Sequence, residues 1–422
     1  MGACIAFARS LAACEVAARL PLLAKVVRPM NILQVHNRYR QPGGEDTVLA
    51  NEARLLREHG HEVHLLEAHN DAQDPAGLVA KARLACNTVW SASGARAMAD
   101  ALARFKPDVV HVHNSFNQFS PVILRTATAQ GVATVQTLHN YRVACANGLL
   151  LRDGRPCELC LTDGRLQAVK HRCYRGSALG SAVVSLTGAL HLQLGTYARR
   201  GLRVVALTEF AHGLLLRAGI GESVLRIKPN FVYPAAPQLQ GLPRDMRVVF
   251  VGRLAAEKGV DLLLDAWRRL APPGWTLELI GDGELRPADA ELGASVRCLG
   301  WLDPAEVLAR VASARYLVMA SRWYEGLPMV LLEALSVGTP ILVPRLGAMA
   351  ELVTEGQDGH AFNPGDPADM AAVLGRALLQ PPAAWQALSD GALRAYQQKF
   401  SPQANLQLLM TIYREAMDDV VR

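Results

Sequence analysis

An apolar segment followed by a glycine-containing turn and a helix constrains the fold of this chain more than any other feature. Residues 316–320 are typical of a buried strand, and Gly326 opens the turn that follows. Pro328 suits the first position of a helix, because the N–H that proline lacks would be unpaired there. Residues 329–337 favour a helix, which Pro340 cannot continue. The stretch therefore predicts a βα unit of a parallel sheet.

Two glutamates lie on this unit, Glu325 at the mouth of the helix and Glu333 about two turns inside it. A helix N-terminus presents free N–H groups and a partial positive charge, which suits a phosphate. On spacing alone, an ordinary βα unit with two exposed glutamates is an equal alternative. The residue pattern from Glu325 to Glu333 resembles the E-x7-E motif of retaining glycosyltransferases of family 4 (GT4), which have the GT-B fold. The resemblance implies that Glu325 faces the donor sugar and that Glu333 binds the nucleotide ribose. The turn of Gly326, Leu327 and Pro328 matches the family loop whose backbone amides meet the diphosphate.

The length and composition of the chain indicate two domains of ordinary size. It has 422 residues, of which 50% are hydrophobic and 19% charged, so a sizeable core is available and disorder is not expected. Eight cysteines in a chain of this length do not suggest a secreted disulfide scaffold. Residues 1–29 have the character of an appended leader or an over-extended start, and residues 30–35 predict a first strand. We expect a cytoplasmic protein.

A glycine-containing loop between a strand and a helix opens the first domain. Residues 32–35 predict the strand, Gly43 and Gly44 lie in the loop, and residues 47–58 have helical periodicity. A similar Gly-Gly-Glu loop lines the cleft of family 4 enzymes, which implies that both glycines lie near the donor. His139 ends another strand. A histidine there is commonly a hydrogen-bonded structural residue, but it matches the family's strand-end histidine near the donor sugar.

Four cysteines gather between residues 145 and 173. Cys157 and Cys160 form a C-x2-C knuckle, which Cys145 and Cys173 flank with eleven and twelve intervening residues. These spacings suit a structural zinc site of four cysteines with no open coordination position. Four reduced thiols or a disulfide pair are the alternatives. No D-x-D motif stands out, so we expect catalysis that requires no cofactor or divalent metal.

The formal net charge of +6 is concentrated in residues 152–203, which contain nine lysines and arginines against three acidic residues. Such a block indicates an anionic partner, either a membrane surface or a charged acceptor, with a solvated face as the alternative. No nucleic-acid motif accompanies the block, and no nucleic-acid partner is expected. Residues 176–198 carry no formal charge and predict a helix that is buried or lies against a membrane. Four arginines flank it: Arg172, Arg175, Arg199 and Arg200.

The second domain begins with an apolar strand that ends at Gly252. The segment from Gly252 through Arg253 and Lys258 resembles the G-R-x-x-x-E-K-G segment of family 4 enzymes. The resemblance implies that Arg253 and Lys258 bind the diphosphate leaving group. Gly281 and Asp282 follow the next strand, at a turn that borders the nucleotide base in the family.

The resemblance covers residues 30–422 and implies an α/β protein of GT-B type, with two Rossmann-like doubly wound domains that face a central cleft. A proline-rich stretch, residues 229–243, predicts the domain boundary. The predicted parts are an acceptor domain at 30–235 with its cysteine-rich insert at 145–173, a nucleotide-sugar donor domain at 236–400, and a terminal helix at 401–422 that returns towards the first domain.

The implied function is retaining transfer of a sugar from a UDP- or GDP-sugar to a glycan or lipid-linked acceptor in cell-surface polysaccharide biosynthesis. A metal-independent front-face mechanism is expected, at the cytoplasmic face of the inner membrane, with these catalytic residues: His139, Arg253, Lys258 and Glu325. Two other classes stay open. A GT-B epimerase or phosphorylase would share the cleft but not this set of residues. A non-catalytic nucleotide-binding subunit would be expected to lose one of them.

Overall fold

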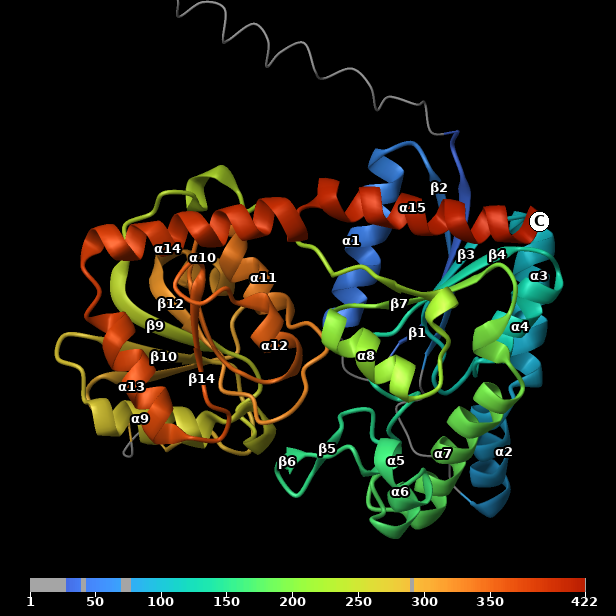
Figure 1. Cartoon of the computed structure of the whole chain (residues 1–422), viewed down its shortest axis with the longest axis horizontal. Coiled ribbons are helices and arrows are strands. Elements are labelled where there is room, and N and C mark those ends of the chain that lie inside the picture. Colours follow the sequence, from blue (N-terminus) through green and yellow to red (C-terminus); the bar gives the residue numbers. More distant parts are fainter. Residues whose placement is uncertain (1–27, 39–42, 70–76, 289–291, 422) are drawn as a thin grey trace, which may run out of the picture.

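The computed structural model describes residues 28–38, 43–69, 77–288 and 292–421, which form two α/β domains side by side (Figure 1). The predicted leader at residues 1–29 lies almost entirely outside the described residues. Each domain is built on a six-stranded sheet in which all neighbouring strands are parallel. The predicted architecture of two Rossmann-like domains is confirmed.

The first sheet has the doubly wound order of strands that parallel βαβ units produce. From edge to edge its strands are β2 (Glu62–His69), β1 (Asn31–Arg38), β3 (Val109–Asn114), β4 (Ala133–Thr137), β7 (Leu202–Ala206) and β8 (Leu225–Ile227). The helices that connect them include α1 (Gly44–Glu58), α3 (Ala92–Phe105), α4 (Val122–Ala129) and α8 (Glu209–Arg217). Every residue of β3 and β4 is buried, because apolar clusters cover both faces of the sheet.

The second sheet repeats this plan. Its strands in order are β11 (Val296–Gly300), β10 (Thr276–Ile280), β9 (Asp245–Val251), β12 (Ala314–Val318), β13 (Ile341–Pro344) and β14 (Gly359–Phe362). Its helices are α9 (Val260–Leu270), α10 (Pro304–Ser313), α11 (Met329–Ser336), α12 (Gly347–Leu352), α13 (Pro367–Leu378) and α14 (Pro382–Ala395). Two further apolar clusters pack on its faces. The predicted βα unit is present as β12 and α11, although Pro328 stands just before the helix rather than at its first position.

A helical lobe projects from the first domain, at the lower right of Figure 1. It consists of α2 (Leu78–Val89), the β5–β6 hairpin (Leu151–Arg152 and Arg155–Pro156), α5 (Leu159–Thr162), α6 (Leu166–Lys170) and α7 (Ala178–Gln193). Helix α7 packs against both α2 and α6. The cysteine-rich segment and the uncharged segment of the sequence therefore belong to one structural unit.

The chain ends by crossing from the second domain to the first. A π-helical turn (Tyr396–Phe400) joins α14 to α15 (Pro402–Val421); in Figure 1 α14 lies over the second domain and α15 over the first. Helix α15 packs on β4 and β7 of the first sheet. Its Glu415 and Asp419 form ion pairs with Arg203, and Tyr413 shares a 2.8 Å hydrogen bond with His111. The terminal helix is therefore part of the core of the first domain.

A group of buried charges ties this helix to the first sheet. Glu52 of α1 is fully buried, and its Oε1 lies 2.8 Å from His111 Nδ1 and 3.2 Å from His113 Nε2. Lys228 Nζ is 3.2 Å from the other oxygen of Glu52 and 3.4 Å from the side-chain oxygen of Asn405 on α15. Glu52, His111 and His113 lie close enough to one another to hold a metal ion. Lys228 already supplies the compensating positive charge, so we interpret the group as structural.

Replacement of Lys228 by Met should destabilise the first domain by about 3–5 kcal/mol, because it leaves the carboxylate of Glu52 buried without its cation. Urea denaturation measures this as a lower midpoint. The matched control is Arg54→Met on the same helix, which removes an exposed pair with Glu58 and should not move the midpoint. Equal midpoints for Lys228→Met and Arg54→Met would show that the buried pair does not stabilise the fold.

Candidate active site

The predicted site residues of the second domain meet at the carboxyl ends of its strands. Glu325 is 6% exposed and precedes α11. Its Oε1 accepts hydrogen bonds from Lys258 Nζ and Ser321 Oγ, each at 2.7 Å. The backbone carbonyl of Glu325 accepts a 3.0 Å hydrogen bond from the hydroxyl of Tyr141 in the first domain. Glu325 is thus held in a fixed orientation from both sides of the domain boundary.

Lys258 and Arg253 lie on the loop between β9 and α9 but in different surroundings. Lys258 ends a short 3-10 turn and lies 5.4 Å from the ring of Trp323, on the same side as Glu325. Gly259 follows it at φ +70°, and a Cβ there would stand 2.0 Å from the carbonyl oxygen of Ala320. Glycine therefore allows the loop to approach the end of β12. The side chain of Arg253 is 64% exposed and pairs with Glu257, so it is available at the surface of the loop.

The other predicted donor-side residues of the β9 and β10 loops have a backbone role. Gly281 adopts φ +131°, and a Cβ there would stand 2.0 Å from the carbonyl oxygen of Gly252. The two loops are in direct backbone contact for this reason. Asp282 is largely exposed, and its carboxylate accepts a hydrogen bond from the N–H of Gly283. These residues shape the rim of the site.

The start of α11 faces the first domain closely. A Cβ on Gly326 would stand 2.8 Å from the carbonyl oxygen of His139, and a Cβ on Gly44 would stand 3.4 Å from the side chain of Met329. Leu327 is buried in the apolar cluster that covers one face of the second sheet, and Pro328 offers no side-chain cap to the helix. The N–H of Leu331 donates to the carbonyl of Pro328, so within the described residues the N–H groups of Met329 and Val330 are left for another acceptor, as at a phosphate-binding helix. Gly43 lies next to Gly44, and its N–H donates to Asp46.

Glu333 lies in α11 in a low-dielectric environment. Burial raises the pKa of its carboxyl, and the described residues form no ion pair with it. A half-buried carboxylate without a cationic partner can accept hydrogen bonds from ligand hydroxyls, because few protein donors occupy its oxygens. This is the property that the ribose-binding prediction requires.

His139 follows β4 and begins a hydrogen-bonded series that continues through His113 to Glu52. Its Nε2 lies 3.1 Å from His113 Nδ1, and the Nε2 of His113 lies 3.2 Å from Glu52. Since a carboxylate only accepts, His113 donates to Glu52 and accepts from His139. Burial lowers the pKa of His113 to about 4. Burial, together with repulsion from His113 and Lys228, also holds the pKa of His139 well below its usual value, so both rings are neutral at pH 7.

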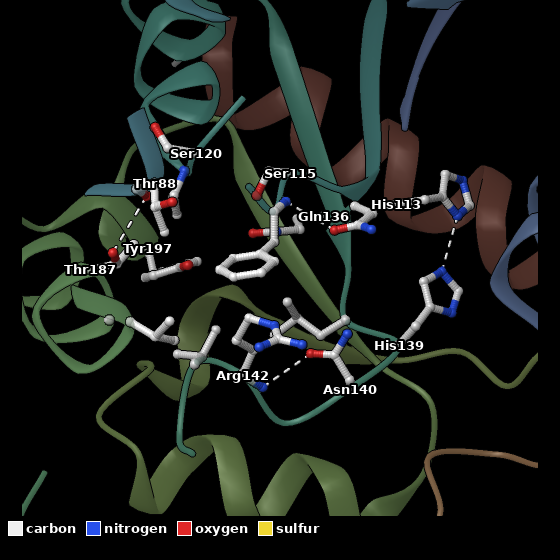
Figure 2. A pocket seen from close by; sticks show the side chains of 17 residues that line it. Thr88, His113, Ser115, Ser120, Gln136, His139, Asn140, Arg142, Thr187 and Tyr197 are labelled. Carbon is white, nitrogen blue, oxygen red and sulfur yellow. Dashed lines mark hydrogen bonds between the residues drawn. The ribbon is translucent and has the colours of Figure 1, made fainter. Parts of the chain in front are cut away.

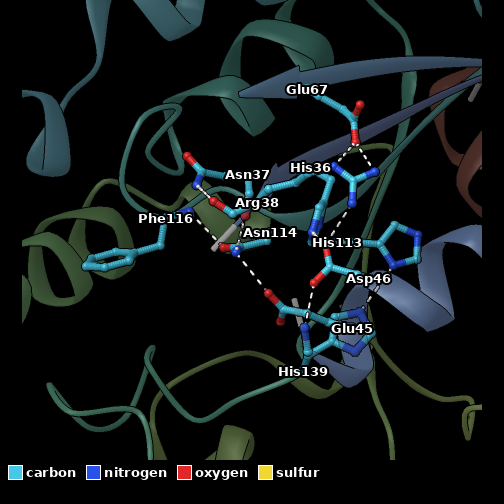
Figure 3. Close-up of polar contacts among 11 residues, drawn as sticks. His36, Asn37, Arg38, Glu45, Asp46, Glu67, His113, Asn114, Phe116 and His139 are labelled. Atoms are coloured by element: carbon cyan, nitrogen blue, oxygen red, sulfur yellow. Dashed lines mark hydrogen bonds and ion pairs between the residues drawn. The ribbon is translucent and has the colours of Figure 1, made fainter. Parts of the chain in front are cut away.

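Sequence reasoning passed over one half-buried carboxyl of the first domain. Glu45 follows Gly43 and Gly44 in the first turn of α1, and its carboxylate accepts a 3.1 Å hydrogen bond from the side-chain amide of Asn114 (Figure 3). Burial, and then the adjacent charge of Asp46, raises its pKa to about 8. The signal was present in the sequence, because Glu45 belongs to the same Gly-Gly-Glu loop. Tyr141 was also missed, because 184 positions separate it from Glu325, and so was Ser321, although it lies four positions before Glu325.

The four cysteines of the insert come together. Cys145 is buried, its N–H donates to the carbonyl of Tyr141, and Cys160 and Cys173 pack on one small apolar cluster. Burial, and then repulsion from the other three thiols, raises the pKa of Cys160 to about 11. Within the described residues, no three of the four sulfur atoms lie within 4.8 Å of one another. The four sulfur atoms are therefore near one another but do not have the tetrahedral arrangement of a zinc site.

Two family models match the chain. A model described as "Glycosyltransferase Family 4" matches residues 42–236, and one described as "Glycosyl transferases group 1" matches residues 245–380. Each of the two parallel-sheet domains thus matches a domain model of the GT-B glycosyltransferase class. Within that class, the chain belongs to the family 4 (GT4) type, as its sequence motifs predicted.

The sequence relatives agree with this assignment. A glycogen synthase of Mycobacterium tuberculosis is 34% identical over 177 residues, which is 40% of this chain and 42% of that protein. The MMP alpha-(1->4)-mannosyltransferase of Mycolicibacterium hassiacum is 35% identical over 40% of this chain and 38% of its own length. A phosphatidyl-myo-inositol mannosyltransferase of Mycobacterium leprae is 32% identical over 40% of this chain and 48% of its own. The chain thus spans less than half the length of these relatives.

The fold is shared with solved structures over nearly the whole chain. A glycosyltransferase from Rickettsia africae has a TM-score of 0.65 at 15% identity, covering 93% of this chain and 99% of that one. Anabaena HepE in complex with UDP and glucose has a TM-score of 0.58 at 17% identity, covering 91% and 99%. At these identities the likeness concerns the fold.

Replacement of Gly326 by Ala should open the cleft, because the new Cβ would overlap the carbonyl oxygen of His139. Small-angle scattering should show a larger radius of gyration, with little loss of thermal stability in either domain. The control is Gly213→Ala in α8, where a Cβ meets nothing within 4 Å. An unchanged scattering curve for Gly326→Ala would show that the closed contact does not persist in solution.

Proposed function

We propose that the protein is a retaining glycosyltransferase that moves a sugar from a UDP- or GDP-sugar to a glycan or lipid-linked acceptor in cell-surface polysaccharide biosynthesis. The observation that carries the proposal is the buried pair of Glu325 and Lys258 beside the uncapped N-terminus of α11. The solved complexes of Anabaena HepE with UDP and with UDP-glucose support a nucleotide-sugar donor for this fold.

Each donor group has a matching protein group. The diphosphate would lie between Lys258 and the free N–H groups of α11, and Arg253 would exchange Glu257 for a phosphate oxygen. The ribose hydroxyls would meet Glu333. The donor sugar would lie against Glu325 and the segment that carries His139. Charge stabilisation of the departing diphosphate is the main catalytic contribution of such a site.

A front-face reaction fits this distribution of charges. Glu325 is ion-paired with Lys258 and hydrogen-bonded to Ser321, which favours a positioning role over that of a covalent nucleophile. The acceptor hydroxyl would attack on the face from which the diphosphate departs, and its proton would pass to a phosphate oxygen of the leaving group. The neutral His139 would then contact the sugar without adding a second positive charge. Neither a metal nor another cofactor is assigned a catalytic role in this proposal.

The other classes differ in measurable ways. A GT-B epimerase or phosphorylase would act on the nucleotide sugar without glycosyl transfer to a second sugar. A binding subunit would hold the nucleotide tightly but would show no turnover. The presence of Glu325, Glu333, Arg253 and Lys258 together favours the transferase over both.

Lys258→Ala should lower kcat/KM by an amount equal to about 2–4 kcal/mol of transition-state stabilisation, as the loss of one oxyanion donor does. The measurements are a thermal-shift panel with UDP, GDP and ADP, which names the donor class, followed by turnover with the matching nucleotide sugar. Lys399→Ala, on the π-helical turn, is the control of equal charge change. Wild-type turnover in Lys258→Ala would remove this residue from the mechanism, and no shift with any nucleotide would remove the donor site.

We also propose that the helical lobe contacts an anionic membrane surface at the cytoplasmic face of the inner membrane. Helix α7 has an unusual distribution of side chains. Its buried positions include Ser181, Thr187 and His191, whereas Leu179 and Leu186 are 77% and 55% exposed. Among the described residues, one segment, Ala178–Ala198, has the length and apolarity of a membrane span, and 28% of its apolar window is buried. A helix with an apolar outer face suits an interface, and the positive charges around it suit acidic lipids.

Other side chains of the lobe add to this surface. Val79 of α2 and Leu166 of α6 are 83% and 81% exposed. Of the flanking arginines, Arg199 and Arg200 donate to Thr128 and to the backbone of Asp419, so they also have structural contacts. Arg172 is exposed at the end of the lobe.

The double variant Leu179→Ser/Leu186→Ser should bind vesicles of phosphatidylglycerol much more weakly than the wild type, because it removes the exposed apolar area. Co-sedimentation measures this, with phosphatidylcholine vesicles as the uncharged comparison. Leu379→Ser in the second domain is the matched control, since Leu379 is 86% exposed. Equal binding by all three proteins would show that the lobe is not the contact surface.

We propose, finally, that Cys145, Cys157, Cys160 and Cys173 bind a structural zinc ion. Burial, and then repulsion from the neighbouring thiols, raises the pKa of Cys160 and of Cys173, and zinc would replace this repulsion by binding four thiolates. The sulfur atoms would move to about 3.8 Å from one another, as tetrahedral Zn–S bonds require. Such a site would anchor the segment that runs from His139 to Cys145.

Purified protein should contain about one zinc per chain, and Cys160→Ser should lose it together with thermal stability. Elemental analysis by mass spectrometry measures the metal. Cys86→Ser is the control, because Cys86 is exposed and lies outside the cluster. Zinc-free protein with four thiols that react freely, or with disulfides in the insert, would contradict the proposal.

A further inference from the structure

A pocket in the first domain lies beside His139 and extends towards the helical lobe (Figure 2). One side is formed by the segment from His139 to Val143, which follows β4. The opposite side is formed by Val184, Thr187 and Gly188 of α7. None of the donor-binding residues of the second domain lines it. The pocket is therefore on the acceptor side of the cleft, and it is lined by the buried face of the helix whose other face carries exposed leucines.

Arg142 places a positive charge in this pocket. Its Nη1 donates to the carbonyl of Ala146 at 3.2 Å, and its guanidinium lies 4.2 Å from the ring centre of Phe116. A Cβ on Gly148 would stand 3.3 Å from Nη2, so the absence of a side chain there leaves room for the guanidinium. The Nε of Arg142 is buried and has no hydrogen-bond partner. In the described parts of the chain, no carboxylate forms an ion pair with this arginine.

An unpaired arginine is costly in such a place. Arginine presents five donors in a planar fork, and a buried donor without an acceptor, as Nε is here, loses its hydration. The positive charge of Arg142 opposes the rise that burial causes in the pKa of the Glu45 carboxyl, but the two side chains are not in contact. The arrangement has the form of a site that is complete when an anionic oxygen group occupies the fork, as carboxylates and phosphates do.

Gln136 gives an independent indication of a ligand. It lies on β4, lines the same pocket and is 4% exposed. Its Oε1 is buried and has no hydrogen-bond partner. Buried amide oxygens in proteins are almost always hydrogen-bonded, so this atom marks a place where a donor is missing. A sugar hydroxyl is a donor of the required kind. Arg142 offers a donor to an anion in this pocket, and Gln136 offers an acceptor to a hydroxyl.

From these two observations we propose that the pocket binds an acidic group of the acceptor, a phosphate or a carboxylate, through Arg142, and an adjacent hydroxyl through Gln136. The inference rests on the proposed transferase function, because it names the chemical class of the second substrate. Arg142 and Gln136 act in binding and specificity. A lipid-linked sugar phosphate and an acidic sugar residue of a glycan are the two sources of such a group.

The test is a calorimetric titration of the protein saturated with the nucleoside diphosphate that it binds, so that the donor site is occupied. The probes are glucose 1-phosphate, D-glucuronate and uncharged glucose. We expect one or both of the acidic probes to bind and glucose to bind more weakly. Arg142→Gln should weaken the acidic probe by about tenfold or more, the effect of one charge-assisted hydrogen bond. Arg142→Lys should recover part of it.

Arg104→Gln is the matched control, since Arg104 is exposed on α3 and lies outside the pocket. Binding of glucose 1-phosphate alone identifies a phosphate-bearing acceptor, and binding of glucuronate alone identifies an acidic sugar. Equal affinity for all three probes, no binding of either acid, or wild-type affinity in Arg142→Gln would overturn the inference. The nucleotide-induced thermal shift of Arg142→Gln should equal that of the wild type. If nucleotides cause no thermal shift in the wild-type protein, that result would instead contradict the donor site, which involves Lys258 and not Arg142.

Discussion

The contact between Gly326 and the carbonyl of His139 is the constraint on which the site depends. It brings the first turn of α11 against the end of β4, and the hydrogen bond from Tyr141 to the backbone of Glu325 lies one residue away. A side chain at position 326 would require a shift at this contact, because its Cβ would stand 2.8 Å from the carbonyl oxygen of His139. Because the helix N-terminus, the lysine and the two glutamates belong to one domain and the histidine to the other, the site exists only while this contact holds. The glycine therefore has a role in domain closure besides its role in the turn.

Most of the buried charged groups behind this contact are paired with groups of opposite charge or with hydrogen-bond partners. Glu52 is surrounded by Lys228, His111 and His113, and this group in turn fixes the tautomer of His139. Buried charges cost free energy unless they are paired, so a balanced group can be retained in the core. Several other buried atoms have no hydrogen-bond partner, among them Gln34 Oε1 beside Glu52 and, in the pocket, Arg142 Nε and Gln136 Oε1.

Helix α7 links the pocket to the outer surface of the lobe. Thr187 and Gly188 are buried and line the pocket, whereas Leu179 and Leu186 of the same helix are exposed. A substrate with a polar head and an apolar anchor would use both faces of the lobe, which connects the proposed membrane contact with the proposed acidic acceptor.

The sequence by itself determined the class of fold and much of the donor wall, because those features depend on local patterns. The strand, turn and helix around Glu325, the Gly-Arg segment before Lys258 and the Gly-Gly loop before α1 each have a signature within about twenty residues. The tertiary structure alone decided which groups meet across the chain. Tyr141 reaches Glu325 over 184 positions, and Tyr413 reaches His111 over 302, contacts that no local pattern encodes. Burial is likewise a property of the assembled fold. It turned Glu45 from the end of a loop motif into a carboxyl with a raised pKa, and Arg142 from one of many basic residues into an unpaired cation in a pocket.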